Sequence, residues 1–300
     1  IENFMNLGKI SRIWMPLIGI LFCIADGKSE SNLVFGAEKI VSAGIEMPYR
    51  VAHTDGIGNQ SLVIYLHGGS SKGDDNVTQM KEAGIDSIAN YLDLKQFNAV
   101  FLVPQCPADK SWGGPMLEVL KSLIDRYAST NASDDTDIYI FGGSMGGTGT
   151  WSMLSAYPRL FTAAMPVAGN PSKCDADNVA TTPIYTVMGT SDRIMSVETA
   201  SGFIDELNAR GAITRLDIEE GWTHEVTCIQ SYTTERLDWI FGHNRNSSGI
   251  ENPVAEDNIV KSIQYFSLDG RRLSEAPCKV FFIERLIYND GAVASFKILK

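Results

Sequence analysis

The stretch that decides the fold is residues 138–147, which read Ile138-Tyr139-Ile140-Phe141-Gly142-Gly143-Ser144-Met145-Gly146-Gly147. Its first four residues are a continuous apolar run, as a strand buried on both faces requires. Glycines follow, and then a helical run that contains Trp151, Met153 and Leu154. This order predicts a strand, a sharp turn that exposes Ser144, and a helix whose first N–H groups point toward the serine. The alternative is an ordinary glycine-rich turn between a strand and a helix.

Apolar and amphipathic stretches alternate on both sides of this turn, from about residue 34 to 243. The apolar runs that indicate strands are 61–66, 99–103, 138–141, 163–168 and 184–188, and the amphipathic runs that indicate helices include 116–127, 148–156 and 197–209. Alternating strands and helices predict the α/β class, with a mostly parallel central sheet flanked by helices. The stretches 34–41 and 45–52 are expected to be antiparallel strands that lead into this sheet.

A reactive serine needs a base, and the chain has only His53, His67, His224 and His243. His224 lies in Gly221-Trp222-Thr223-His224-Glu225, after a predicted strand over 214–218 and before a predicted helix over 229–241. Such a loop lets an imidazole reach over the end of the sheet, so His224 is the candidate base. His53 and His243 are expected to be structural or exposed.

The acid that orients the base is expected between Ser144 and His224, on a loop after a strand. The sequence Met188-Gly189-Thr190-Ser191-Asp192-Arg193 supplies it, directly after the predicted strand. Asp192 would accept a hydrogen bond from His224 and fix its tautomer. The alternative role for Asp192 is to cap the helix that starts near Ser196. Acidic residues 217, 219 and 220 lie too close to His224 in sequence to be preferred.

A second glycine turn, His67-Gly68-Gly69, follows the apolar run that ends at Leu66. Backbone N–H groups of such a turn can point at an oxygen that gains negative charge during acyl transfer. The amides of Gly69 and Met145 are therefore the candidate oxyanion hole. His67 is expected to brace this turn, with proton transfer as the alternative.

The two ends of the chain differ from the centre. Residues 1–27 contain basic Lys9 and Arg12 and then an apolar run too short to span a bilayer, as in a cleaved secretory signal. The alternative is a buried N-terminal helix. Residues 28–243 are the expected catalytic domain, 244–257 a polar linker, and 258–300 a small β module. After signal cleavage, no stable membrane span is expected, and the location is secreted, periplasmic or cell-surface.

Composition limits the partners. The formal net charge is −11, and no cluster of Lys and Arg would offset phosphate repulsion, so nucleic acid is not an expected partner.

Apart from Cys23 in the signal, the cysteines are Cys106, Cys174, Cys228 and Cys278, and sequence does not choose among their three pairings. None shows CxxC spacing, so neither a metal site nor a cofactor is expected.

These motifs, in this order, resemble the extracellular esterase branch of the α/β-hydrolase superfamily. The resemblance covers residues 34–243 and rests on Leu66-His67-Gly68-Gly69, the glycine turn around Ser144, Gly189-Thr190-Ser191-Asp192 and Gly221-Trp222-Thr223-His224. The branch holds feruloyl and acetylxylan esterases, polyhydroxybutyrate-depolymerase-like esterases and dienelactone-hydrolase-like enzymes. The tail resembles C-terminal β modules of exported Bacteroidetes proteins, some of which are sorting signals. It differs from them at Phe281-Phe282-Ile283-Glu284, where a glycine-led aromatic strand is usual.

The resemblance implies a secreted serine esterase, with acetyl or feruloyl esters of polysaccharides as substrates. Trp112 and Trp222 are expected to be exposed and to stack on sugar or phenolic rings. The alternatives are a peptidase of the prolyl-oligopeptidase kind, a short-chain lipid esterase, and a non-catalytic binding protein on the same fold. Within these 300 residues, no stretch has the pattern of a propeller domain or of a long apolar lid, which disfavours the first two. An incomplete set of catalytic residues would have indicated the third.

Overall fold

The computed structural model describes residues 31–128, 136–245, 260–267, 271–273, 281–288 and 293–299. The predicted signal segment 1–27 and most of the predicted linker lie outside these residues, so both stay predictions. Among the described residues, no helix is long and apolar enough to cross a membrane.

An eight-stranded sheet forms the centre of the fold, in the order β1-β2-β4-β3-β5-β6-β7-β8. Its strands are β1 (Gly36–Ser42), β2 (Ile45–His53), β3 (Ile57–Leu66), β4 (Phe97–Pro104), β5 (Ile138–Gly143), β6 (Ala163–Val167), β7 (Ile184–Gly189) and β8 (Thr214–Glu219). The strands from β4 to β8 in this order pair in parallel, whereas β1 pairs with β2, and β2 with β4, antiparallel. The sheet confirms the predicted fold class and the antiparallel entry.

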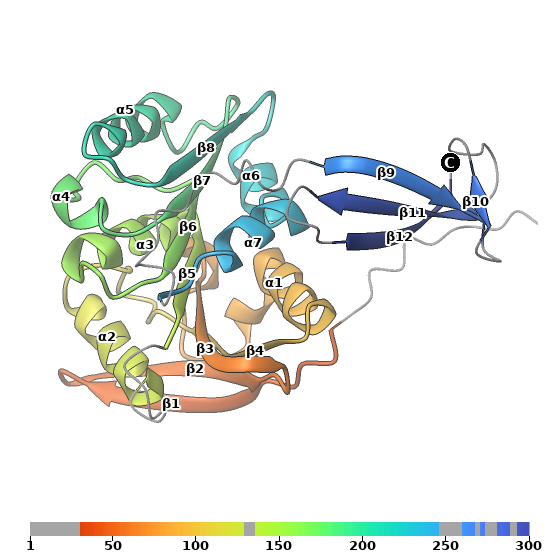
Figure 1. The fold of residues 1–300 in the computed structure, drawn as a ribbon. Coiled ribbons are helices and arrows are strands. Elements are labelled where there is room, and N and C mark those ends of the chain that lie inside the picture. The colour runs from red at the N-terminus through yellow and green to blue at the C-terminus, as the bar shows by residue number, and fades with distance from the viewer. Residues whose placement is uncertain are drawn as a thin grey trace, which may run out of the picture.

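Helices cover both faces of the sheet (Figure 1). They are α1 (Ala83–Leu94), α2 (Pro115–Ala128), α3 (Met145–Ala156), α4 (Ala176–Val179), α5 (Val197–Asn208), α6 (His224–Gln230) and α7 (Thr234–Phe241), with two 3-10 helices, η1 (Gly69–Ser71) and η2 (Thr78–Lys81). Helices α2 to α5 lie on one face, and α1, α6 and α7 lie on the other (Figure 1).

Alternation of side chains along the strands divides the core between the two faces. On β3, Ile64 and Leu66 belong to the core cluster that includes Trp151 of α3, whereas Val63 and Tyr65 belong to the cluster beneath α1 and α7. Successive residues of a strand point to opposite faces, so a continuous apolar run fills both clusters. The predicted apolar runs therefore form the interior strands.

The sequence predicted one helix over 229–241, and here the structure differs. The chain forms two short helices instead, α6 and α7, because Thr223 caps the first and Thr233 caps the second. His224 is consequently the first residue of a helix and not part of a preceding loop. A helix start holds the backbone of His224 more firmly than a loop would.

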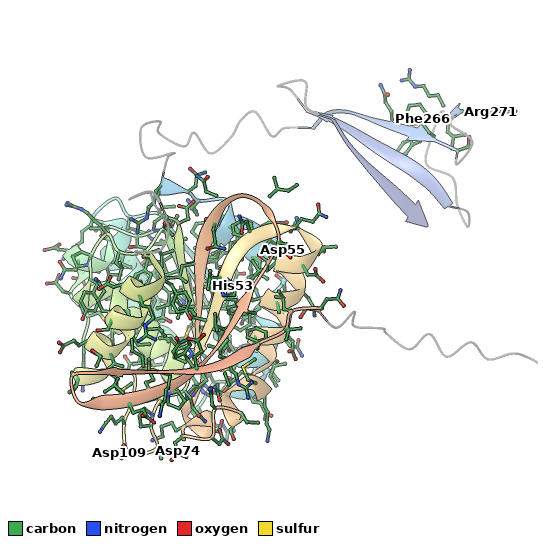
Figure 2. The ribbon with its side chains drawn as sticks, turned by 90° about the horizontal axis from the view of Figure 1, so that it is seen from below. His53, Asp55, Asp74, Asp109, Phe266 and Arg271 are labelled. Carbon is green, nitrogen blue, oxygen red and sulfur yellow. The ribbon has the colours of Figure 1, made fainter. Side chains whose placement is uncertain are left out.

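The carboxyl edge of the parallel strands gathers the candidate residues. Because parallel strands end at the same edge, β3, β5, β7 and β8 all deliver their following residues there. His53 pairs with Val100, in the first half of β4, and so lies away from the carboxyl edge. In Figure 2, Asp74 and Asp109, from loops that follow β3 and β4, lie at the lower edge of the main domain, well away from His53 and Asp55.

The tail contains a second, four-stranded antiparallel sheet in the order β10-β9-β11-β12. Its strands are β9 (Val260–Phe266), β10 (Arg272–Leu273), β11 (Phe281–Tyr288) and β12 (Val293–Leu299). Alternating sequence indicated strands in this region. The division into domains and the sorting role of the tail remain predictions.

Candidate active site

Ser144 occupies a strained turn between β5 and α3. Its φ of 59° and ψ of −117° place it in a region that non-glycine residues rarely adopt. The turn is held by the Ser144 amide, which donates to the carbonyl of Val167 at 3.0 Å. A Cβ atom built on Gly142 would lie 2.4 Å from the oxygen of Gly146, which leaves no room for a side chain there. The glycines therefore let strand and helix approach closely enough to expose the serine.

His224 contacts both of the other candidate catalytic residues. Its Nε2 lies 2.7 Å from Ser144 Oγ, and its Nδ1 lies 2.7 Å from Asp192 Oδ2. With Nδ1 donating its proton to the carboxylate, Nε2 is free to accept the serine proton. The three side chains that the sequence singled out are thus within hydrogen-bond distance of one another.

Asp192 uses both of its carboxylate oxygens. Oδ2 faces His224, while Oδ1 accepts the amides of Ile194 at 2.8 Å and Met195 at 2.9 Å. The Asp192 side chain has no exposed surface. Helix α5 is capped by Ser196, not by Asp192. The aspartate therefore both shapes its own loop and holds the imidazole.

Backbone contacts join the loop of Asp192 to that of His224. Ser191 N–H donates to the Trp222 carbonyl at 3.0 Å, and Gly221 N–H donates to Thr190 Oγ1 at 2.8 Å. A side chain on Gly189 would meet the Trp222 carbonyl oxygen at 2.3 Å, so the two loops touch. This contact fixes the spacing between aspartate and histidine. Sequence could place each loop at the sheet edge but could not show that they bind one another.

The turn at residues 67–69 and the turn at Ser144 each bring one backbone amide to the carboxyl edge of the sheet. Gly69 is the first residue of η1 and Met145 is the first residue of α3. The N–H of a first helical residue has no acceptor within its own helix, so both amides are available to a ligand. They are the donors that the sequence indicated for an oxyanion.

His67 is fully buried and braces this turn. Its ring Nδ1 donates to the Gly68 carbonyl at 2.6 Å, and its Nε2 accepts the amide of Cys106 at 2.9 Å. This pair of bonds requires the neutral ring, and burial lowers the pKa of His67 from 6.5 to about 4. The hydrogen bond from the Cys106 amide links the His67 turn to a loop 39 residues further along the chain, which suits a structural role.

We expect the buried His67 to make stability depend on pH. Below a pH of about 6.5 the unfolded chain takes up a proton at this residue, whereas the folded chain does not until about 4. Acid therefore favours the unfolded state, and the loss between pH 7 and 4.5 is on the order of 2–3 kcal/mol. Urea unfolding at the two pH values measures it. His67→Gln should flatten the slope, while His53→Gln, at an exposed position, should keep it; equal slopes in all three proteins would contradict the assignment.

Trp112 is not exposed as the sequence suggested, and Trp222 is only partly exposed. Trp112 is 2% exposed, and its indole N–H donates to the His67 carbonyl at 3.0 Å. Trp222 is half-buried, with its ring 5.9 Å from the guanidinium of Arg236. That arginine also binds Asp217, at 2.8 Å. The burial of Trp112 contradicts its expected exposure, so its ring supports the His67 turn and is not available to stack on a substrate. Trp222 supports the loop of His224, and its expected role in substrate binding stays a prediction.

A pocket of about 670 Å³ opens beside Ser144 and His224. Its lining includes the polar residues Thr78 and Lys81 and the less polar residues Ile194, Cys228 and Ile229. Ile194 is 67% exposed and Ile229 is 45% exposed. Sequence reasoning missed these two isoleucines because a single exposed apolar residue is common on any surface.

The thiol of Cys228 lies close to the turn of the candidate nucleophile, Ser144. A Cβ on Gly143 would lie 3.4 Å from its Sγ. Burial raises the pKa of Cys228 to about 12, so the thiol is neutral near pH 7 and is a poor nucleophile.

Cys106, Cys174 and Cys228 are free thiols, and Cys278 lies outside the described residues. In the part of the chain that the structure describes, no group of His, Cys, Asp and Glu could hold a metal ion.

The sheet order, the serine turn and the edge that gathers Ser144, His224 and Asp192 define an α/β-hydrolase fold, and the chain is a member of that superfamily. Residues 109–242 match the model of the dienelactone hydrolase family. The matched segment contains all three of those residues, so this part of the chain is placed among the hydrolases.

Two solved structures illustrate the likeness. A thermostable esterase is 28% identical with a TM-score of 0.63, over 70% of this chain and 63% of that one. The feruloyl esterase module of Clostridium thermocellum, in complex with sinapinate, is 13% identical with a TM-score of 0.55, over 70% of this chain and 89% of that one. At this identity the second likeness shows the fold alone.

A curated relative is poly(3-hydroxyalkanoate) depolymerase C of Paucimonas lemoignei. It is 32% identical over 68 residues, which are 23% of this chain and 16% of that protein. The chain thus matches less than two thirds of the depolymerase and of the thermostable esterase.

Proposed function

We propose that this protein is a serine esterase that hydrolyses carboxylic esters through an acyl-enzyme. The observation that carries the proposal is the arrangement of Ser144, His224 and Asp192, with both His224 contacts at 2.7 Å. The names of the similar proteins, a thermostable esterase and a depolymerase of polyesters, support ester substrates. A non-catalytic binding role is disfavoured because every position of the triad is filled and correctly oriented.

In the first step, His224 Nε2 accepts the proton of Ser144 Oγ as this oxygen attacks the ester carbonyl carbon. The carbonyl oxygen becomes an oxyanion that the Gly69 and Met145 amides stabilise. His224 then gives the proton to the leaving alcohol, and the bond to the alcohol oxygen breaks. In the second step, water loses a proton to His224 and attacks the acyl carbon. The bond to Ser144 breaks, the serine regains its proton, and the carboxylic acid leaves.

Acetyl or feruloyl esters of polysaccharides are our proposed substrates, and export by the N-terminal segment is our proposed location. The family resemblance supports the substrates, and the apolar residues Ile194 and Ile229 in the pocket suit an acyl or phenolic group. Trp112 and Trp222 give no support to this part of the proposal. The signal-like pattern of residues 1–27 supports export.

A fluorophosphonate probe and a substrate panel test the function. We expect the probe to label Ser144 in the folded protein, and we expect turnover of acetylated xylan, methyl ferulate and aryl butyrates with little cleavage of peptide amides. Dominant cleavage of peptide amides would favour the peptidase alternative. Dominant cleavage of aryl butyrates would favour the short-chain lipid esterase. A folded protein that neither takes the label nor hydrolyses any ester would favour the binding protein.

A further inference from the structure

Glu82 stands at the start of α1 but does not cap this helix. Glu82 occupies the N-cap position, where a side-chain oxygen can accept an amide of the first helical turn, but it makes no such bond. Its carboxylate instead faces the oxyanion turn, where Oε1 accepts the Gly68 amide at 3.1 Å and the Ser71 hydroxyl at 2.6 Å. One carboxylate oxygen thus joins the two ends of the turn that contains Gly69.

Close packing of α1 fixes the place of Glu82. A Cβ on Gly84 would lie 2.6 Å from ring carbons of both Tyr65 and Tyr232. Only a residue without a side chain lets the first turn of α1 approach the end of β3 this closely. The backbone of Glu82 is also tied to η2, because its N–H donates to the Gln79 carbonyl. The carboxylate is therefore presented to the turn by a rigid helix start.

Every other polar group of the Gly68 peptide is also engaged. The Gly68 carbonyl accepts His67 Nδ1 at 2.6 Å and the Ser71 amide at 3.2 Å. With the Gly68 N–H held by Glu82, the next amide along the chain, that of Gly69, is the first one free for a ligand. A Cβ on Gly68 would lie 3.4 Å from Glu82 Oε1 and 3.7 Å from Ser144 Cβ, so this contact lies against the nucleophile.

We propose that Glu82 is a positioning residue that orients the Gly69 N–H toward the oxyanion, a role that rests on the serine-esterase function proposed above. Glu82 acts through the turn and does not touch the reacting atoms. The oxyanion is negative, so a negative carboxylate nearby brings no electrostatic advantage to the transition state. The turn requires an acceptor oxygen from Glu82, and the side-chain amide of a glutamine at this position would also supply one.

Three variants of the full chain test this role with 4-nitrophenyl acetate. Glu82→Ala removes the acceptor and should lower kcat about 10–100-fold, with KM changed less than about 3-fold. This loss is smaller than the roughly 10²–10³-fold for complete removal of an oxyanion donor, because the Gly69 amide is misplaced and not removed. Glu82→Gln keeps the acceptor and should retain at least about a third of kcat. Glu118→Ala is the control, since Glu118 is likewise near a helix start, in the first turn of α2, but its side chain is exposed.

A trifluoromethyl ketone, which adds to the serine and forms an oxyanion, provides a second measurement. Its affinity for Glu82→Ala should fall by the same factor as kcat, an effect that a general loss of stability would not produce. If Glu82→Gln is as slow as Glu82→Ala, or if Glu82→Ala equals the wild type while Ser144 is still labelled, the positioning role is wrong and the esterase function stands. If the wild type is inert to both probe and ester, both proposals are wrong.

Discussion

Ser144→Ala should lower kcat toward esters by about 10⁴-fold or more, while the protein unfolds at the same temperature as the wild type. The variant loses the atom that forms the acyl-enzyme, and His224 Nε2, 2.7 Å away, loses the proton it would accept. Asp192 and His224 then have no hydroxyl group to activate. Initial rates with 4-nitrophenyl acetate at pH 7.5 and a thermal melt measure both parts of the expectation.

The matched control is Ser152→Ala, in the helix that follows Ser144. Its Oγ donates only to the Thr148 carbonyl, at 2.9 Å, so activity should stay close to that of the wild type. Retention of more than about a hundredth of the wild-type rate by Ser144→Ala would contradict a serine nucleophile. The neighbouring thiol of Cys228 would then be the group to examine, although its raised pKa, about 12, makes it a weak rival near neutral pH.

The sheet and the triad could be predicted because their signals are local and their geometry is general. A continuous apolar run such as 138–141 indicates a strand buried on both faces wherever it occurs. Parallel strands end at one edge, so residues that follow β5, β7 and β8 meet there although they are far apart in sequence. The approach of the three residues to one edge thus followed from the strand order, whereas their hydrogen-bond distances come from the structure.

Side-chain placement within the site could not be predicted in this way. Trp112 looks like a surface aromatic in a loop, but its indole N–H finds the His67 carbonyl 45 residues away and the ring is buried. Glu82 carries no local signal, because its partners Gly68 and Ser71 belong to another turn. Burial and long-range hydrogen bonds depend on the packing of all elements at once, which a single sequence does not display.

Gly146→Ala should destabilise the fold severely, because the methyl group has nowhere to go. A Cβ at this position would lie 1.8 Å from the Leu66 carbonyl oxygen and 2.5 Å from its carbon. Both are backbone atoms of β3, so no rotamer change relieves the clash, and either α3 or the strand end must shift. We expect a loss of roughly 3 kcal/mol or more in the free energy of unfolding. That loss corresponds to a fall in melting temperature on the order of 10 °C.

Gly202→Ala is the control for this substitution, because Gly202 lies in α5 with no atom within 4 Å of a built Cβ. Alanine favours a helix, so this variant should be as stable as the wild type or about 0.5–1 kcal/mol more stable. Circular-dichroism melts of the two variants then compare one added methyl group in two helices. A melt of Gly146→Ala within about 2 °C of the wild type, well short of the fall that the clash implies, would mean that α3 can move away from β3 at little cost. If α3 can move away from β3 at little cost, the turn between β5 and α3 would not hold Ser144 at its strained φ of 59°. Stability and reactivity of this site thus depend on the same close approach of helix and strand.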